Sequence, residues 1–216
     1  MTKKAVIFDL DGTLVNSIPV HYKVHRDVFK KFGINLTPHF FQVHCNGTEA
    51  HEAYRYVLNH FLGSDELYEK AWQTHNKLRT SVDLSKIKIF PGVKRMLKQL
   101  KEENYKLAVA SSSHETYVRA LLENNGITDF FDFITGSDHV KHSKPNPAIF
   151  LNAWKGLGIP KKNCIIIEDT NNGVIAAKRA GIECLCLLTS EKEDDIPRYA
   201  HIVDKHSMLF NIIDSL

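Results

Sequence analysis

The chain has 216 residues, 43% hydrophobic and 25% charged, with a formal net charge of +3 at pH 7. These proportions are typical of a folded globular protein and exclude collagen, a coiled coil and a disordered chain. The basic residues are spread along the chain and no apolar run approaches about 20 residues, so we expect neither a nucleic-acid partner nor a membrane span.

Short apolar, β-branched runs alternate with helical patterns along most of the chain. Runs that are apolar throughout are typical of parallel strands buried on both faces. Strand and helix repeated in this way predict an α/β sandwich around a parallel sheet. The predicted strands are residues 4–10, 106–110, 133–135, 163–167, 184–188 and 201–203.

The alternation is interrupted between residues 16 and 84, where four helical stretches follow one another. Apolar residues at helical spacing mark three of these stretches, and Thr37-Pro38 precedes the remaining one. The pattern predicts a small helical bundle, residues 16–84, inserted into a core of residues 1–15 and 85–216, with a ligand crevice between the two. The marking residues are Val20, Val24, Val28 and Phe32, then Ala53, Val57 and Phe61, then Leu67, Ala71 and Leu78.

Two carboxylates stand at the end of the first predicted strand. Asp9 and Asp11 are two residues apart, a spacing that points both side chains the same way on an extended chain. Gly12 allows a sharp turn after them. Two converging carboxylates repel unless a cation lies between them. The alternative is an ordinary turn at a strand end.

Three further polar clusters also follow predicted strands. They are Ser111-Ser112-Ser113, Lys144 ahead of Pro145, and Glu168-Asp169. Taken singly, each has a simpler interpretation as a helix cap, a solvated lysine or acids at a helix start. Because the carboxyl ends of parallel strands share one edge of a sheet, all four clusters are expected to meet there. Hydroxyls, a lysine and acid pairs together favour a phosphate and metal site over unrelated caps.

The cysteine and histidine positions indicate less. Cys45, Cys164, Cys184 and Cys186 form no C-x-x-C pair, which favours a reducing, cytoplasmic setting. The chain starts with a basic and then apolar segment, but Asp9 interrupts it too early for a signal peptide. His21 and His25 have the i, i+4 spacing of a metal pair without an evident third ligand.

Together, the four clusters resemble the motifs of the haloacid dehalogenase-like superfamily, in its β-phosphoglucomutase and phosphoglycolate phosphatase-like branch with a helical cap. The first motif stands here as Asp9-Leu10-Asp11-Gly12-Thr13, the second as Ser111, the third as Lys144 and the fourth as Glu168-Asp169. The resemblance covers essentially the whole chain. It implies a Rossmann-like three-layer core with a parallel sheet, plus an inserted small helical-bundle cap domain.

The resemblance also implies a function. The expected activity is magnesium-dependent hydrolysis of a small phosphorylated metabolite, such as a sugar phosphate or phosphoglycolate, through an aspartyl-phosphate. Asp9 is then the nucleophile and Asp11 the general acid and base. Asn16 departs from the family pattern, since many members carry an acid there. The other implied roles are phosphate binding by Ser111, Ser112 and Lys144, Mg²⁺ binding by Asp9, Asp11, Glu168 and Asp169, and substrate contacts from the cap by Ser17, His21, Gly47 and Thr48.

Several alternatives remain open. A phosphosugar mutase would use the same core, but those mutases carry an arginine in the cap loop that here reads Gly47-Thr48-Glu49-Ala50, and Arg55 is a weak substitute. A haloacid dehalogenase proper needs neither Asp11 nor the Glu168-Asp169 pair. A protein that kept the fold for binding or regulation, without turnover, is the alternative from another class. No oligomerisation signal is evident, so a monomer is expected, with a homodimer as the alternative.

Overall fold

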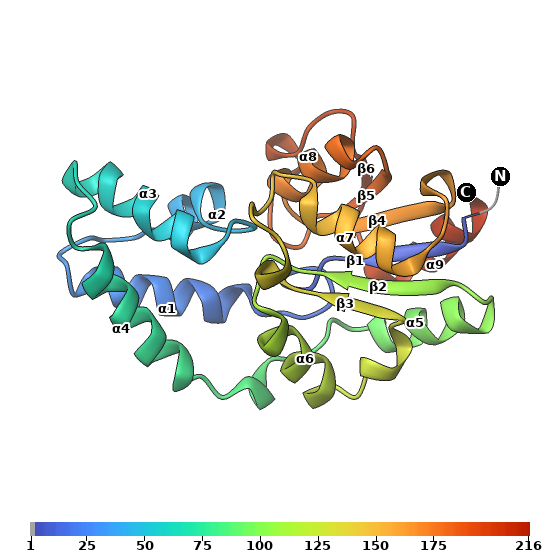
Figure 1. Cartoon of the computed structure of the whole chain (residues 1–216), viewed down its shortest axis with the longest axis horizontal. Coiled ribbons are helices and arrows are strands. Elements are labelled where there is room, and N and C mark those ends of the chain that lie inside the picture. The colour runs from blue at the N-terminus through green and yellow to red at the C-terminus, as the bar shows by residue number, and fades with distance from the viewer. Residues whose placement is uncertain (1–2) are drawn as a thin grey trace.

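The computed structural model describes residues 3–216, so the first two residues of the predicted core lie outside the described part. Six parallel strands form one sheet in the order β3-β2-β1-β4-β5-β6 (Figure 1). Strand β1 lies in the centre of the sheet, between β2 and β4. The strands are β1 Ala5–Phe8, β2 Lys106–Ala110, β3 Phe133–Thr135, β4 Cys164–Glu168, β5 Glu183–Leu187 and β6 His201–Val203.

Nine α-helices accompany the sheet in the described residues. They are α1 Ile18–Lys30, α2 Pro38–His44, α3 Ala50–Leu62, α4 Tyr68–Thr80, α5 Val93–Glu102, α6 Glu115–Asn124, α7 Ala148–Leu157, α8 Asn171–Ala180 and α9 His206–Ser215. Short 3₁₀ turns lie at Leu84–Lys86, Thr128–Phe130, Ser137–His139, Lys161–Asn163 and Glu193–Asp195.

Alternate residues of each strand face opposite sides of the sheet, and both sides are covered by helices. Val6 and Phe8 of β1 pack with α5, α6 and α9, whereas Ala5 and Ile7 pack with α7 and α8. The sheet is therefore the middle layer of a three-layer α/β/α arrangement, and every residue of β1 is fully buried. The predicted fold class is confirmed; β2, β3 and β6 have the predicted bounds, and the ends of β1, β4 and β5 are displaced by one or two residues.

Helices α1 to α4 form a second body beside the sheet (Figure 1). Their shared core is separate from the two cores of the sheet and is built around Phe29, Tyr54 and Leu58. The two connections to this body lie together, since Val15 and Ile89 pair in an antiparallel bridge. We refer to α1–α4 as the four-helix segment.

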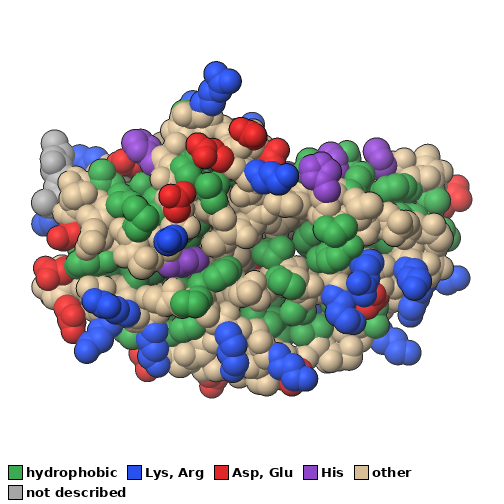
Figure 2. Space-filling model, turned by 180° about the vertical axis from the view of Figure 1, so that it is seen from behind, with side chains coloured by type: hydrophobic (Ala, Val, Ile, Leu, Met, Phe, Trp, Pro, Cys, Tyr) green, Lys and Arg blue, Asp and Glu red, His purple; other side chains and the backbone are tan. Residues whose placement is uncertain are grey.

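The helical periodicity is wrong at two positions of this segment. Phe61 and Leu67, which continue the apolar pattern, are 41% and 39% exposed. Phe61 lies at the surface, where its ring centroid is 5.0 Å from that of Phe40. Figure 2 shows histidine and hydrophobic side chains next to one another on the part of the molecule formed by the four-helix segment. His44 stacks on Tyr56, with the ring centroids 5.1 Å apart. Phe61 therefore packs against another aromatic ring at the surface and is not part of the buried core of the segment.

A search of residues 3–216 finds no helix that is both long enough and apolar enough to cross a lipid bilayer.

The separate core of the four-helix segment gives a testable difference between two leucines of α3. Leu58 is fully buried, whereas Leu62, one turn later, is 45% exposed. We expect Leu58→Ala to lower the free energy of unfolding by about 2–5 kcal/mol, because it leaves a cavity. Leu62→Ala, the matched control, should change it by less than about 0.5 kcal/mol. Urea unfolding followed by circular dichroism measures both; equal losses would contradict the assignment of this core.

Candidate active site

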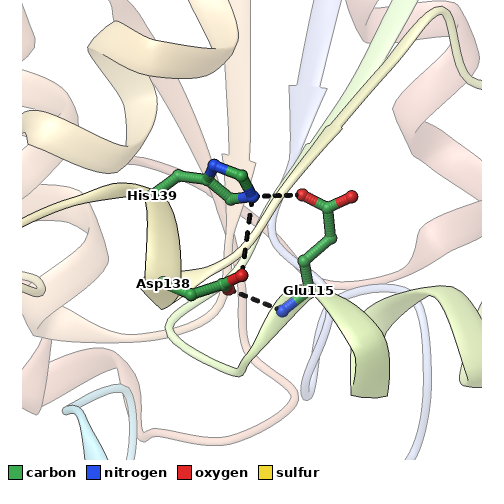
Figure 3. A group of neighbouring side chains, drawn as sticks. All are labelled: Glu115, Asp138 and His139. Atoms are coloured by element: carbon green, nitrogen blue, oxygen red, sulfur yellow. Dashed lines mark hydrogen bonds and ion pairs between the residues drawn. The ribbon is translucent and has the colours of Figure 1, made fainter.

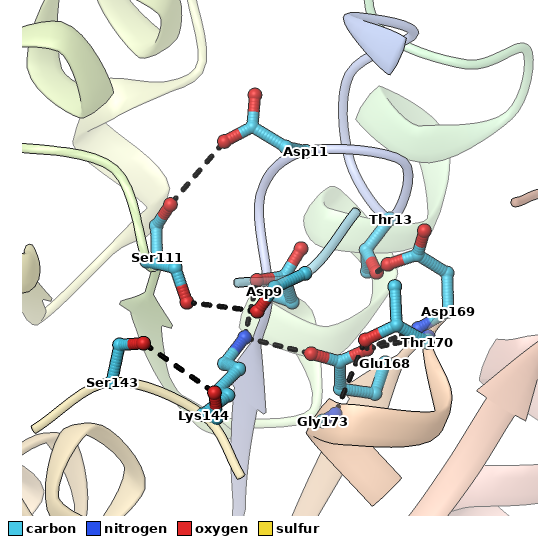
Figure 4. A network of polar contacts seen from close by, with 12 residues as sticks. Asp9, Asp11, Thr13, Ser111, Ser143, Lys144, Glu168, Asp169, Thr170 and Gly173 are labelled. Carbon is cyan, nitrogen blue, oxygen red and sulfur yellow. Dashed lines mark hydrogen bonds and ion pairs between the residues drawn. The ribbon is translucent and has the colours of Figure 1, made fainter. Parts of the chain in front are cut away.

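Three buried carboxylates meet where β1 and β4 end. Asp9 follows β1, while Glu168 ends β4 and Asp169 follows it, and β1 and β4 are neighbours in register. One oxygen from each side chain lies within 4.8 Å of the others (Figure 4). The exposed fraction is 5% for Asp9, 1% for Glu168 and 0% for Asp169. We refer to Asp9, Glu168 and Asp169 as the acid group.

Lys144 supplies the positive charge that faces the acid group. Its Nζ lies 2.5 Å from Asp9 Oδ1 and 2.7 Å from Glu168 Oε1, and the side chain is 1% exposed. Burial lowers the pKa of a lysine, but Asp9 and Glu168 outweigh this effect and raise the pKa of Lys144 above its ordinary value. Lys144 is therefore charged, and it holds Asp9 and Glu168 together.

The second oxygen of Glu168 is occupied by the start of α8. Glu168 Oε2 accepts the backbone N–H groups of Asp169 and Thr170 at 2.6 and 2.7 Å and the Thr170 hydroxyl at 3.0 Å. A Cβ atom on Gly173 would collide with the Glu168 carboxyl group, so a glycine is required there. Glu168 is thus fully hydrogen-bonded within the chain.

Asp169 is oriented by two hydroxyls. Thr13 Oγ1 donates to Asp169 Oδ1 at 2.8 Å, and Ser190 Oγ, in the loop after β5, donates to Asp169 Oδ2. Gly12 has φ +91°, and a Cβ atom on it would collide with the Asp169 carboxylate. The turn after β1 therefore needs glycine for its backbone conformation and for this close approach.

Burial and like charge raise the pKa of two members of the acid group. Burial raises the pKa of Asp9 to about 8; Lys144 acts against this shift, while Glu168 and Asp11 add to it. Burial, Glu168 and Asp9 raise the pKa of Asp169 well above its ordinary value, against its hydroxyl partners. If all three carboxylates were ionised, their charge would exceed that of the one ammonium by two, and the raised pKa values of Asp9 and Asp169 reflect this excess. An oxygen-rich group of this kind suits a hard divalent cation, which favours the ionised form of each carboxylate.

The carboxylate of Asp11 lies outside the acid group. Its Oδ1 accepts from Ser17 Oγ at 2.6 Å and lies 2.9 Å from His21 Nε2, and its Oδ2 accepts from Ser113 Oγ at 2.8 Å. Ser111 Oγ is 3.3 Å from the same Oδ2. Burial would raise the pKa of Asp11, but His21 and the hydroxyls of Ser17 and Ser113 lower it to about 2. Asp11 is therefore ionised and joins the sheet to α1.

The remaining predicted residues lie where the four-helix segment meets the sheet. Ser112 Oγ donates to the backbone oxygen of Gly47 at 3.3 Å, and the Thr48 hydroxyl donates to the backbone oxygen of Cys45 at 2.7 Å. Gly47, at φ +72°, lies against Thr170 so closely that a Cβ atom would be 2.7 Å from Thr170 Oγ1. Each sequence-predicted site residue thus lies at this edge of the sheet, at the start of α1, or in the loop between α2 and α3 that faces the edge.

A cavity of about 460 Å³ lies between the sheet edge and the four-helix segment. Asp9, Asp11 and the Ser111–Ser113 loop line one end. The four-helix segment supplies the opposite wall, which is largely apolar, aromatic and imidazole in character. The residues of that wall include Val24, His25, Phe41, His51, Trp72, His75 and Arg79.

A second group of possible metal ligands, Glu115, Asp138 and His139, lies at the start of α6 (Figure 3). His139 Nε2 is 2.6 Å from Glu115 Oε2 and 3.5 Å from Asp138 Oδ2. Asp138 Oδ1 accepts the backbone N–H of Glu115 at 2.8 Å and so caps the helix. These side chains are partly exposed and pair with one another, so helix capping and an ion pair explain the group.

Sequence reasoning missed several residues that support or line the site. Thr13 stands within the first motif, and its hydroxyl could have been assigned to the site from that position. Ser190 follows β5, the strand next to β4, so its place at the same sheet edge was the available signal. Tyr117 and Arg79 carried no signal, because their approach depends on how α4 and α6 are packed.

Fold and site together define an α/β enzyme with a buried, lysine-paired acid group beneath a substrate-sized cavity. The family model of haloacid dehalogenase-like hydrolases matches residues 6–187, and the chain belongs to this family. The predicted family and enzyme class, a hydrolase, are confirmed.

Relatives of known name agree with this assignment. The phosphorylated carbohydrates phosphatase of Thermotoga maritima is 30% identical over 83% of this chain and 82% of its own length. The fructose-1-phosphate phosphatase of Escherichia coli is 26% identical over 83% of this chain and 94% of its own. The crystal structure of β-phosphoglucomutase from Clostridium difficile superposes with a TM-score of 0.83 and 28% identity, covering 99% of this chain and 96% of that one.

Two buried histidines of the cavity wall predict an acid-sensitive stability. His25 Nδ1 donates to the backbone oxygen of His21 at 2.9 Å, and His75 Nδ1 lies 2.9 Å from the Tyr54 hydroxyl. Burial lowers the pKa of His25 to about 4 and that of His75 to about 3. The unfolded chain, whose imidazoles titrate near 6.5, therefore binds more protons between about pH 6.5 and pH 4. The free energy of unfolding should fall as the pH is lowered through this window, by up to roughly 3 kcal/mol per histidine.

His75→Gln keeps a hydrogen-bonding partner for Tyr54 but cannot take up a proton, so its stability should depend less on pH. Urea unfolding between pH 7.5 and 4 measures this, with His201→Gln, at an exposed position, as the control. An unchanged slope for His75→Gln would refute this origin of the pH dependence.

Proposed function

We propose that the protein is a magnesium-dependent phosphatase that hydrolyses small phosphomonoesters, of the sugar phosphate or phosphoglycolate type, through an aspartyl-phosphate on Asp9. The observation that carries the proposal is the buried Asp9 carboxylate, held by Lys144 at 2.5 Å within an acid group that opens on a cavity. Membership of the hydrolase family and the names of the two phosphatases support it. In this proposal α1–α4 are the cap domain, within residues 16–84.

In the first step an Asp9 oxygen attacks phosphorus, and the bond from phosphorus to the leaving oxygen breaks. Asp11 donates a proton to that leaving oxygen. In the second step Asp11 takes a proton from water, whose oxygen attacks phosphorus, so that phosphate leaves and the Asp9 carboxylate is restored. His21, Ser17 and Ser113 hold the pKa of Asp11 near 2. Asp11 can therefore carry the proton it donates only when the leaving oxygen has replaced some of these three partners.

The phosphoryl oxygens need positive charge and donors around them. We assign Ser111, Ser112 and Lys144 to these oxygens. Ser111 and Ser112 follow β2, the strand beside β1, and Lys144 contacts Asp9 directly. A charged, buried Lys144 stabilises the negative charge that develops on the phosphoryl group.

The acid group fits a magnesium ion. Asp9, Asp169 and Glu168, whose oxygens lie within 4.8 Å of one another, would hold it together with the backbone oxygen of Asp11. A bound divalent cation would neutralise the phosphoryl oxygens and balance the acid group. The chain's own part is to orient Asp169 through Thr13 and Ser190.

A mutase of the β-phosphoglucomutase kind is the second candidate, favoured by the similarity to the Clostridium difficile enzyme. Residues 47–50 offer no arginine for a second phosphate. Arg55, the possible substitute, is held by Asp65 at 2.6 Å and lies over the ring of Tyr68 at 3.8 Å. Engaged in this way, Arg55 does not line the cavity, so the arginine that the mutases carry in this loop has no counterpart at residues 47–55. The names of the two phosphatases make the phosphatase the better supported activity.

Asp9→Asn should abolish turnover. An amide oxygen is a far weaker nucleophile than a carboxylate, so we expect phosphate release to fall by more than about 10³-fold. The assay is release from a panel of small phosphomonoesters with magnesium and then with chelator, and circular dichroism checks that the variant folds. Normal turnover by Asp9→Asn would overturn the mechanism. Isomerisation of β-glucose 1-phosphate faster than phosphate release would identify the mutase instead.

Thr13→Val should weaken metal binding through Asp169. The substitution keeps the shape of the side chain and removes the hydroxyl that donates to Asp169 at 2.8 Å. Loss of such an orienting hydrogen bond costs about 10- to 100-fold in metal affinity. Calorimetric titration of the protein with Mg²⁺ measures the affinity directly. Thr128→Val, which changes a threonine away from the cavity, is the control; equal affinities for wild type and Thr13→Val would refute the role of Thr13.

A further inference from the structure

The positive charge that lines the cavity between the sheet and the four-helix segment is concentrated on one side chain. Among the described residues that line it, Arg79 is the one lysine or arginine. It stands on α4, one residue before that helix ends at Thr80, and so on the four-helix segment, whereas Asp9 follows β1 of the sheet. A cation in this position can act on the part of a ligand that is remote from the reacting phosphorus.

The guanidinium of Arg79 has no acidic partner among residues 3–216. The other arginines of the four-helix segment are paired: Arg26 lies 2.8 Å from Asp27 and Arg55 lies 2.6 Å from Asp65. Arg79 instead lies 5.5 Å from the ring centroid of Tyr117, on α6 of the other body. Its planar donors therefore remain available for a carboxylate or phosphate, which they can bind in a bidentate manner.

A chain of contacts relates Arg79 to Asp11. His21 Nε2 is 2.9 Å from Asp11 Oδ1. The ring centroids of His21 and Tyr117 are 5.8 Å apart, and the Arg79 guanidinium is 5.5 Å from the Tyr117 ring centroid. In the proposed function Asp11 contacts the leaving oxygen. A leaving group that extends from Asp11 along Tyr117 thus reaches Arg79.

The rest of the helical wall offers little other charge in this direction. Val24, Phe41 and Trp72 are apolar or aromatic, and burial keeps His25 and His75 neutral at physiological pH by lowering their pKa values. His75 precedes Arg79 by one helical turn, and the Arg79 charge also disfavours its protonation. Besides Arg79, the segment adds the Glu49 carboxylate to the lining, and this carboxylate accepts the backbone N–H of His51 at 3.0 Å. Arg79 is therefore the group of this wall that can attract an anion through a permanent positive charge.

We propose that Arg79 forms an anion subsite, so that the preferred substrates are phosphomonoesters whose leaving group carries a second anionic group, a carboxylate or a phosphate. The inference rests on the proposed phosphatase function and narrows its substrate class. Arg79 is a specificity-determining residue in this proposal and takes no part in bond making or breaking.

The test compares kcat/KM for two classes of ester in the presence of magnesium. The acid-bearing class is 2-phosphoglycolate, with a carboxylate, and fructose 1,6-bisphosphate, with a phosphate; the neutral class is glycerol 1-phosphate and fructose 1-phosphate. We expect the wild type to favour the acid-bearing class, and Arg79→Gln to lower the ratio of the two kcat/KM values by about 10- to 100-fold, chiefly through KM. Arg79→Lys should give an intermediate ratio, because the charge is kept and the bidentate geometry is lost.

Lys77→Gln is the matched control, since it removes one positive charge from the same helix at an exposed position that does not line the cavity. Its ratio should equal that of the wild type. A wild type without preference, or an Arg79→Gln variant that keeps the preference, would overturn the subsite and leave the phosphatase intact. A preference confined to one acid-bearing ester would identify carboxylate or phosphate as the group bound. Absence of phosphate release from every ester would overturn the phosphatase itself, and the subsite with it.

Discussion

The burial of three carboxylates against one ammonium is the constraint on which the rest of the site depends. The parallel pairing of β1 with β4 brings Asp9 next to Glu168 and Asp169, where water cannot solvate them. Burying charge is costly unless it is paired and hydrogen-bonded. Lys144 and the backbone amides of Asp169 and Thr170 offset that cost only in part, so burial and like charge raise the pKa values of Asp9 and Asp169. A divalent cation, as in the proposed function, would offset the remaining cost.

The three acids accept different numbers of hydrogen bonds from the chain, and this difference distinguishes Asp9 from the other two. Both oxygens of Glu168 are occupied by donors of the chain, and both oxygens of Asp169 accept a hydroxyl. Asp9 has one strong contact, with Lys144 Nζ. All three acids line the cavity, and Asp9 is the one among them with the fewest hydrogen bonds. It is the member of the group best placed to form a new bond.

Much of this arrangement could be predicted from the sequence, for a physical reason. Apolar strands that end in polar clusters determine the sheet and its reactive edge, because side chains at the carboxyl ends of parallel strands must meet. The two-residue spacing of Asp9 and Asp11 was less informative, since β1 ends at Phe8 and Gly12 turns the chain. The Asp11 carboxylate therefore joins Ser17, His21 and Ser113 instead of the acid group. Periodicity identified the helices of residues 16–84 but could not identify their neighbours, so Arg79 and Tyr117 were missed.

The two walls of the cavity differ in how many hydrogen bonds hold them in place. In the proposed function, the wall at the sheet edge carries the reacting groups and the wall on the four-helix segment selects the substrate. The acid group is fixed by hydrogen bonds from Lys144, from the hydroxyls of Thr13 and Ser190, and from the backbone amides that follow β4. The four-helix segment reaches the sheet edge through separate polar contacts. They include Ser17 and His21 with Asp11, Ser112 with Gly47, Ser143 with the Glu49 amide, and Gln42 with the Ser190 backbone oxygen. A substitution on α4 can therefore change what the cavity accepts without moving Asp9 or Lys144. The Gln42 contact is the exception, because Ser190 also orients Asp169, and through it α2 is coupled to the acid group.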